Sequence, residues 1–567
     1  MSQKSSEGES SSLHPGLRFL APAPTPYDPL VWQTLPRSER LRQACEAWVV
    51  DGYGVPLGLY VFYVLKVAAF IGAWVFFCSF NAPLVGGSVD AGWMWTVDAF
   101  QKALVWSMAF EVLGMGCGSG PLSGRYKPPF AAPFHFCRPG TVKLPLFSGF
   151  PFPGGTRRTG FDAVLYAVYV AWLFRILVAP VVTPSLIAPA LVMLAILGLS
   201  DKTILLASRA EHYGSMLVCC LFPVDLIPGA MVVALGLWLW AGVSKLNAHF
   251  PSVVGVMACN SPWMRWKTFR KAMVKSYPED LRPSGMSQAM AYGGTALEMG
   301  IPLLLLVGTG GDITTAGLVL MVVFHVYILS NVPMAVPLEW NVTVVYGALF
   351  LFGHHGGISI TDIESPWLMA FLGFAVVGIP LLGNWMPSRV SFLLSMRYYA
   401  GNWPFAVWLF RGDAAEKLRE HLPMVSDLPE VQLADFCDER EIAAAMSKVP
   451  AFRGMHLHGR ALHDLIPLAV DDESEYVTYD GEIVAGLVLG YNFGDGHLHG
   501  SKLLEAVQER CGFLPGEVRH VYVEAQPLGI GRHRWEIRDA ADGVLSAGSI
   551  EVSTLLERQP YPPARES

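Results

Sequence analysis

Charged residues are scarce in this sequence of 567 residues. Asp, Glu, Lys and Arg make up 15% of the chain, whereas a typical soluble domain carries about 25%. Hydrophobic residues make up 52%, which excludes a disordered chain or a coiled coil and favours an integral membrane protein in contact with the lipid bilayer. The net charge of −7 gives no reason to expect nucleic acid as a partner.

Several familiar motifs are also absent. The nine cysteines include no C-x-x-C pair, which argues against a zinc knuckle or a disulfide-stapled secreted domain and favours reduced, buried thiols. The first 15 residues lack the apolar run of a signal peptide, so we expect the first transmembrane helix to direct insertion.

The few charges are unevenly distributed. Residues 58–383 contain 18 Lys or Arg against 14 Asp or Glu, whereas residues 384–567 contain 17 against 27. We therefore expect a transmembrane domain at 57–390 and a soluble domain at 395–567. Residues 1–56 are expected to form a disordered tail and, at 35–50, an amphipathic helix at the membrane interface.

The apolar stretches predict a polytopic α-helical membrane protein with about ten transmembrane helices, since a span needs about 20 apolar residues. The fourth and fifth stretches are interrupted by DKT at 201–203 and EH at 211–212, and are alternatively one broken or re-entrant unit. The ten stretches are 57–80, 93–116, 161–180, 185–200, 205–224, 228–248, 286–308, 314–334, 338–356 and 366–383.

Basic residues predict the orientation of these spans. The loops 117–160 and 249–285 each contain six Lys or Arg, whereas the connections 81–92, 309–313 and 357–365 contain none. Because basic loops stay in the cytoplasm, we expect a multi-pass protein of the cell membrane with both termini cytoplasmic.

The soluble domain is predicted to be mixed α/β. Helical periodicity marks 414–422 and 440–449, and strand-like alternation marks 475–491 and 518–528. Residues 532–552 predict a β-hairpin with its turn at Asp542-Gly543.

Ionisable residues inside apolar stretches are candidates for function, because burying them in a bilayer is costly. Lys245 ends an apolar helix, where a partly desolvated lysine can act as a general base; the alternative is a lysine that snorkels to the interface. Glu298 lies within a span and needs a partner, for which Lys245 is the candidate. His325 lies in an apolar helix, and Glu111 lies near the end of another.

A second group of polar residues occupies 200–214. Asp201 and Lys202 are placed to neutralise each other, and Glu211 is placed to orient His212. The alternative is an ordinary short cytoplasmic loop.

Three of these segments carry a family resemblance. DKT at 201–203, His212-Tyr213-Gly214 and AGVSKLNAHF at 241–250 resemble the membrane domain of vitamin K-dependent γ-carboxylase and its horizontally transferred transmembrane superfamily. Glu298 and Phe324-His325 occupy comparable places downstream. The resemblance covers about residues 160–345, and the whole chain is also similar to a bacterial family of transmembrane proteins of unknown function.

The resemblance implies a quinone-dependent, carboxylase- or epoxidase-like reaction. Lys245 would be the base that deprotonates a reduced quinone of the menaquinone or vitamin K type, and His212 would stabilise charge, with Glu298 and His325 as further catalytic candidates. Ser244 departs from the family, which has a lysine there, and the C-terminal domain shows no likeness to that of the carboxylase. The residues expected to contact the quinone are Asp201, Lys202, Trp240 and Asn247.

The sequence leaves two other readings open. One is a non-enzymatic transporter or membrane scaffold with a cytoplasmic ligand- or metal-binding domain. The other places the chemistry in the soluble domain, where HLHG occurs twice and Asp495 lies nearby. His-x-His places two imidazoles on one face of a strand, and if the two HLHG segments are neighbours a metal site is expected; its candidate ligands are His456, His458, His497 and His499. The alternative is two glycine-rich polar turns with exposed histidines.

Overall fold

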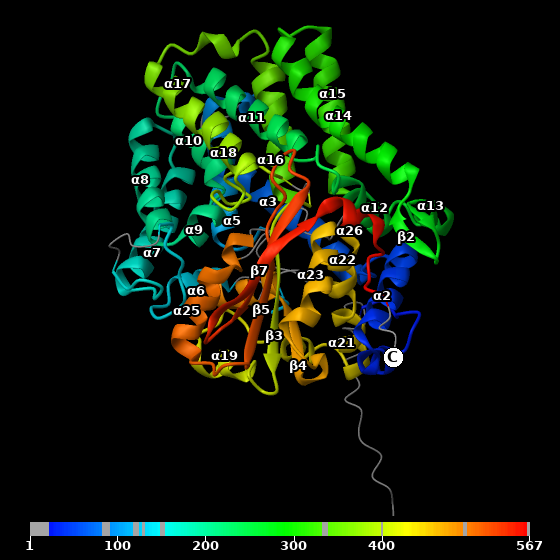
Figure 1. The fold of residues 1–567 in the computed structure, drawn as a ribbon. Helices are drawn as coiled ribbons and strands as arrows, with labels where there is room; N and C mark the ends of the chain where they lie inside the picture. Colours follow the sequence, from blue (N-terminus) through cyan, green and yellow to red (C-terminus); the bar gives the residue numbers. More distant parts are fainter. Residues whose placement is uncertain are drawn as a thin grey trace, which may run out of the picture.

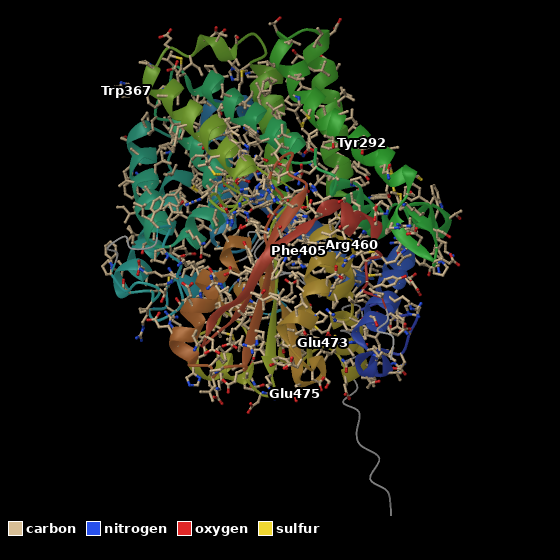
Figure 2. All side chains as sticks on the ribbon, viewed as in Figure 1. Tyr292, Trp367, Phe405, Arg460, Glu473 and Glu475 are labelled. Atoms are coloured by element: carbon tan, nitrogen blue, oxygen red, sulfur yellow. The ribbon has the colours of Figure 1, made fainter. Side chains whose placement is uncertain are left out.

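The structure is a computed structural model of the chain, and it describes residues 22–81, 91–116, 124–127, 131–147, 153–330, 338–398, 401–491 and 496–563. A helical region is joined to a region built around a β-sheet (Figure 1). Exposed Tyr292 and Trp367 lie on the outer faces of the helical region, whereas Glu473 and Glu475 lie at the opposite end of the molecule (Figure 2). Most of the expected N-terminal tail lies outside the described residues.

Among the described residues, six helical segments are long and apolar enough to cross a membrane. They confirm a multi-helix membrane core, but the predicted total of ten spans is not confirmed. The six are α3 (Leu57–Cys78), α7 (Gly160–Leu177), α11 (Leu226–Val243), α14 (Gly285–Val307), α15 (Asp312–Leu329) and the continuous run Pro366–Trp385, made of α17 (Pro366–Leu372), η7 (Gly373–Gly378) and α18 (Ile379–Trp385).

The other four expected stretches contain shorter helices, and one of these helices lies deep in the core. Helix α5 is buried along nearly its whole length, including Lys102 and Glu111, and it packs against α3, α7 and α16. A helix that is buried on all sides forms the centre of a bundle rather than its lipid-facing surface. These stretches contain α5 (Val97–Val112), α8 (Pro184–Ser200), α9 (Lys202–Ala207), η4 (Ala210–Gly214), α10 (Ser215–Cys219), α16 (Leu338–Ala348) and η5 (Leu349–His354).

The interruptions predicted at 201–203 and 211–212 are present. The side chain of Asp201 caps α9 by accepting a hydrogen bond from the backbone of Thr203. Arg209 then adopts a left-handed conformation with φ of 50°, and a π-helical turn, η4, follows. Positive φ is rare for a non-glycine residue and departs from the right-handed helical conformation. The helix therefore breaks at Arg209.

The C-terminal region contains a five-stranded antiparallel sheet of order β4-β3-β5-β6-β7. The hairpin of β6 and β7 is confirmed, with Asp539 opposite Gly543 at its turn. Helix α23 (Leu457–Ala469) packs against β3 and β5. The strands are β3 (Phe405–Arg411), β4 (Tyr476–Asp480), β5 (Val518–Val523), β6 (Arg532–Asp539) and β7 (Gly543–Glu551).

The predicted strand at 475–491 is only partly correct, since β4 ends at Asp480 and α24 (Gly481–Leu489) follows it. The carboxylate of Asp480 caps this helix by accepting a hydrogen bond from the backbone of Glu482. All of α24 is buried, and a short buried helix cannot be told from a strand by its apolar pattern alone.

Short elements complete the C-terminal region. The helices expected at 414–422 and 440–449 are present as α19 and α21. They and their neighbours are α19 (Glu416–His421), α20 (Pro429–Leu433), α21 (Glu439–Met446), α22 (Lys448–Met455), η8 (Glu473–Glu475), η9 (Gly496–Leu498), α25 (Ser501–Cys511) and α26 (Val552–Glu557).

The N-terminal helix α2 (Arg37–Asp51) packs against α22 and against α12 (Phe250–Asn260). Buried Trp48 donates a hydrogen bond to the carbonyl of Val256 and lies 5.8 Å from the ring of Phe452. The apolar face expected at a lipid interface therefore contacts protein. The remaining short elements are α1 (Pro29–Thr34), η2 (Ala91–Trp95), α6 (Ala132–Phe136), α13 (Lys267–Ala272), β1 (Val274–Ser276), β2 (Asp280–Pro283) and η6 (Ile360–Asp362).

Candidate functional site

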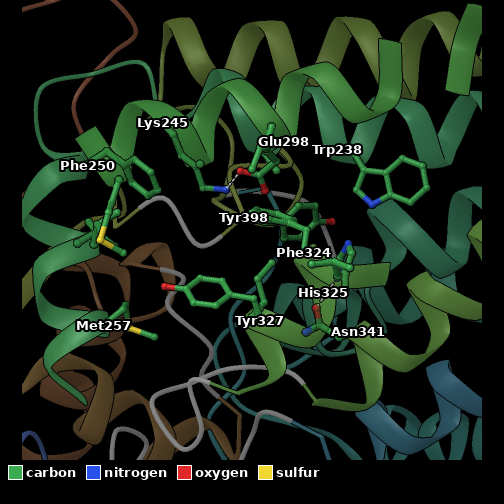
Figure 3. Close-up of a pocket in the computed structure, with 18 of the residues that line it drawn as sticks. Trp238, Lys245, Phe250, Met257, Glu298, Phe324, His325, Tyr327, Asn341 and Tyr398 are labelled. Atoms are coloured by element: carbon green, nitrogen blue, oxygen red, sulfur yellow. Dashed lines mark hydrogen bonds and ion pairs between the residues drawn. The ribbon is translucent and has the colours of Figure 1, made fainter. Parts of the chain in front are cut away.

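A cavity of about 500 Å³ lies between helices α11, α12, α14, α15 and α16 (Figure 3). Its wall is mostly aromatic and aliphatic, and only a few polar side chains reach it. The side chains that shape it include Trp238, Phe250, Met257, Phe324, Tyr327 and Trp340.

Lys245 and Glu298 form an ion pair in the wall of this cavity (Figure 3). Their side chains are 8% and 10% exposed. The ammonium also lies 5.6 Å from the centre of the Phe250 ring. The expected pairing of Glu298 with Lys245 is thus confirmed.

A small residue brings these two side chains together. Gly242 of α11 faces α14, and a Cβ atom added there would lie 2.4 Å from the side chain of Met299. Because real Cβ contacts are wider, the two helices can approach this closely only through glycine. Gly242 therefore sets Lys245, three residues later, beside Glu298, which precedes Met299.

His325 is another polar side chain in the wall of the cavity. Its Nδ1 lies 2.7 Å from the side-chain oxygen of Asn341, which lines the cavity from α16. An amide oxygen is an acceptor, so this contact assigns the proton to Nδ1 and leaves Nε2 as the acceptor nitrogen of the neutral ring.

His212 lies outside this lining. Its ring is 5.7 Å from Trp340, whose other neighbours are Tyr398 at 5.2 Å and His325 at 6.4 Å. Trp340 therefore lies between His212 and the cavity that holds Lys245. His212 does not share this cavity with the ion pair, as the carboxylase resemblance would require for direct contact with one ligand.

Tyr398 connects the cavity with a buried ionic network. Its hydroxyl donates a hydrogen bond of 2.7 Å to Glu211, which lies 3.7 Å from Arg209. Arg209 also lies 3.5 Å from Glu111. A further buried pair joins Lys66 of α3 to Glu339 of α16 at 3.2 Å.

The sequence reasoning missed part of this network. Lys66 lies inside the first apolar stretch, and the criterion that selected Glu298, an ionisable residue within an apolar stretch, would also have selected Lys66. Tyr398 follows the last helix of the core, and Trp340 is one of 17 tryptophans. Neither residue carries a local signal.

The four expected quinone contacts lie outside the cavity lining. Asp201 pairs with Arg158 at 2.6 Å, rather than with Lys202, so the expected mutual neutralisation is wrong. Lys202 donates to the carbonyl of His497, and Trp240 donates to the carbonyl of Val376. The side chain of Asn247 accepts a hydrogen bond from the backbone of Gly529. The side chains of these four residues therefore make contacts between distant segments of the chain rather than with the cavity.

The first HLHG segment begins a helix instead of forming a strand. His456 is the N-cap of α23, and its Nδ1 lies 2.8 Å from the carbonyl of Phe452. His458 is fully buried, with its ring 4.2 Å from that of His533 and 5.3 Å from Phe405. Burial lowers the pKa of His456 to about 4, so this ring is neutral at pH 7.

The second HLHG segment begins within η9, which contains His497 and Leu498. His497 lies 3.7 Å from Glu524, and the carbonyl of His499 lies 3.0 Å from Nε2 of His520. Asp495 lies outside the described residues. Within the part of the chain that the structure describes, no group of three or more His, Cys, Asp or Glu could hold a metal ion.

Six long apolar segments around a buried polar core define the class of the chain as an integral membrane protein. The chain belongs to the family described as "Transmembrane protein of unknown function (DUF3556)", whose model matches residues 17–567. No curated protein and no solved structure matches it. The resemblance to the γ-carboxylase superfamily has no support from these comparisons.

Proposed function

We propose that this protein binds a lipid-soluble molecule with an acidic hydroxyl group, such as a quinol, and takes a proton from it. The observation that carries the proposal is the ion pair of Lys245 and Glu298 inside an apolar cavity. Burial of a charge pair in a membrane core is costly, which makes a functional role the default interpretation.

The cavity suits such a ligand. A volume of about 500 Å³ falls in the usual range of small-molecule pockets, about 300–1,000 Å³. The rings of Trp238, Phe250, Phe324 and Trp340 offer faces against which a planar aromatic ring can stack. The few polar groups would fix the orientation of the ligand.

The ligand would enter from the bilayer. Leu297 of α14 and Val323 of α15 both line the cavity, yet they are 45% and 62% exposed on the apolar outside of the helical region. An opening between lipid-facing side chains favours a hydrophobic ligand that partitions into the membrane over a water-soluble one.

The ion pair assigns the roles of its two members. An ammonium has no free lone pair and cannot accept a proton, whereas a carboxylate can. Glu298 is therefore the base that receives the hydroxyl proton, and Lys245 is the cation that stabilises the oxygen anion left on the ligand. This reverses the expectation that Lys245 is the base. His325 is a second hydrogen-bonding point for the ligand.

Reduced menadione is a suitable probe, because its naphtholate absorbs at a longer wavelength than the neutral quinol. The wild type should bind it and show the naphtholate band. Glu298→Gln should bind the probe without this band, and Lys245→Met should bind it more weakly, whereas the exposed control Glu505→Gln should behave like the wild type. Absence of saturable binding to the wild type would overturn the proposal.

A second candidate is a carrier that moves such a molecule, or a proton, along a path of polar groups. It is favoured by Tyr398, which lines the cavity and bonds to Glu211 of the buried ionic network. Proteoliposomes separate the two candidates. A carrier changes uptake of the probe without forming a product, and its rate depends on Glu211 as much as on Glu298.

We further propose that all ten apolar stretches cross the membrane. Contacts with the C-terminal region follow the second, fourth and sixth stretches: Arg125 bonds to Gly490, Lys202 to His497 and Asn247 to Gly529. The intervening turns meet one another instead, as where Asp225 accepts from the backbone of Glu364. This alternation supports ten crossings with both termini on one side.

The basic loops favour the cytoplasm of the cell for that side. Cysteine labelling tests this arrangement. Thr361→Cys should react with an impermeant maleimide added outside cells, and Glu505→Cys should react only after lysis. The opposite pattern would overturn the orientation.

A further inference from the structure

The segment between α12 and α14 presents an unusual surface. Trp263 and Trp266 are each 76% exposed, although tryptophan is normally buried. Exposed basic side chains lie close to them in the sequence. We call this group the Trp–Lys surface; it consists of Trp263, Arg265, Trp266, Lys267, Lys271 and Lys275.

The backbone beneath this surface is held in place. Buried Arg270 donates hydrogen bonds to the carbonyls of Val50, Ser261 and Met264. The ribbon of β1 and β2 follows at once and is tied to the C-terminal region, since Arg282 donates to the carbonyl of Glu557. The two exposed tryptophans therefore belong to a segment whose backbone is fixed by hydrogen bonds.

The positive charge of the surface is only weakly compensated within the protein. Lys267 lies 4.0 Å from Asp51 while its side chain stays 69% exposed, and such pairs contribute little. Nearby Asp280 is already paired with Arg282. Lys271 contacts the ring of Tyr277 at 4.5 Å. An excess of positive charge therefore faces outward beside the two indoles.

The place of this surface in the fold indicates its partner. It lies at the outer edge of the molecule, at the end of α12 and just before the start of membrane-spanning α14 (Figure 1). Tryptophan is enriched where hydrocarbon meets headgroups, and lysines near a membrane surface bind anionic lipids. Both residue types occur here at the level where α14 leaves the membrane.

We propose that the Trp–Lys surface binds the headgroups of anionic phospholipids in the leaflet next to the C-terminal region. Trp263 and Trp266 enter the glycerol region, and the lysines contact phosphates. Helices α12 and α14 both line the cavity, so this contact also fixes the depth of the cavity opening in the bilayer.

Lipid titration of the full-length protein in mild detergent tests the proposal. Phosphatidylglycerol should raise the unfolding temperature more than phosphatidylcholine does, and high salt should remove the difference. Each cation near an anionic surface strengthens binding roughly fivefold, so K267Q/K271Q/K275Q should bind phosphatidylglycerol about a hundredfold more weakly. The control K127Q/K417Q/K502Q removes the same charge elsewhere and should respond like the wild type.

A second measurement does not depend on the lysine variant. Phospholipids brominated near the headgroup should quench more tryptophan fluorescence in the wild type than in W263F/W266F. Equal quenching, or an equal response of the wild type to both lipids, would overturn the proposal. Binding of an acidic protein to this surface with no lipid preference would also overturn it.

Discussion

The hydroxyl of Tyr398 donates a hydrogen bond of 2.7 Å to the carboxylate of Glu211, a residue 187 positions earlier in the chain. One end of Tyr398 faces the apolar cavity, and the other end contacts a buried network that includes Arg209 and Glu111. A ligand in the cavity and the ionic interior of the helical core are therefore separated by one side chain.

Tyr398→Phe should destabilise the protein, because it removes a donor to a buried carboxylate. Loss of a buried hydrogen bond of this kind costs about 1–3 kcal/mol. Equilibrium unfolding in detergent measures the difference. Tyr292→Phe, on the exposed outer face of α14, is the matched control and should have no effect. Equal stability of both variants would show that Glu211 does not depend on Tyr398.

Replacing one member of the Lys245–Glu298 pair should lower the free energy of unfolding more than replacing both. Lys245→Met or Glu298→Gln alone leaves one polar group unpaired in the cavity wall, at a cost of about 3–5 kcal/mol. The double variant removes both and should lie closer to the wild type. The four proteins form a double-mutant cycle measured by unfolding. Strictly additive losses would mean that the two groups do not interact.

Arg453 should be essential for the stability of the C-terminal region. Its guanidinium bonds to both carboxylate oxygens of Asp480, at 2.5 and 3.0 Å, and lies 3.2 Å from Glu482. All three are buried, so Arg453→Met removes this cation from beside two adjacent carboxylates. We expect a loss of about 3–5 kcal/mol, seen as early loss of secondary structure on heating. Arg411→Met, which removes an exposed pair with Glu475, is the control and should be nearly neutral.

Acid should weaken the protein before its carboxylates titrate. Burial, assisted by the charge of Arg37, lowers the pKa of His463 to about 3, against an unfolded value of 6.5. Between these values the unfolded chain binds a proton that the folded chain does not, so stability falls as the pH drops below 6.5. At pH 5 this histidine alone costs about 2 kcal/mol.

The measurement is the free energy of unfolding at pH 7 and pH 5. Burial also lowers the pKa of His135, which contributes with the same sign. His463→Leu should flatten the profile, whereas replacement of exposed His421 should leave its slope unchanged. An unaltered slope in His463→Leu would refute the assignment.

Charge and periodicity predicted much of the fold because they are local properties. They located the mixed α/β character of the C-terminal region, the β6–β7 hairpin, the interruptions at 201–203 and 211–212 and the partnership of Glu298 with Lys245. They failed at α24, where burial on all sides erased the periodicity that distinguishes helix from strand. They also failed at the HLHG segments, because a histidine pair on a strand and one at a helix start look alike.

The cavity itself could not be predicted, because it depends on contacts between distant segments. Tyr398 and Trp340 acquire their positions only when the last part of the chain packs against η4 and α16. Likewise Asp201 pairs with Arg158, 43 residues away, rather than with its neighbour Lys202. Proximity in the sequence favoured Lys202 as the partner of Asp201, whereas the partner is Arg158.

The packing of α2 against α22 sets an order for biosynthesis. Helix α2 leaves the ribosome hundreds of residues before α22 is translated, and Trp48 has no complete partner surface until Phe452 has been made. Contacts between such distant segments form late. In a chain interrupted before α22, the apolar face of α2 would therefore be only partly covered, and such surfaces are what chaperones and proteases recognise in unfinished proteins.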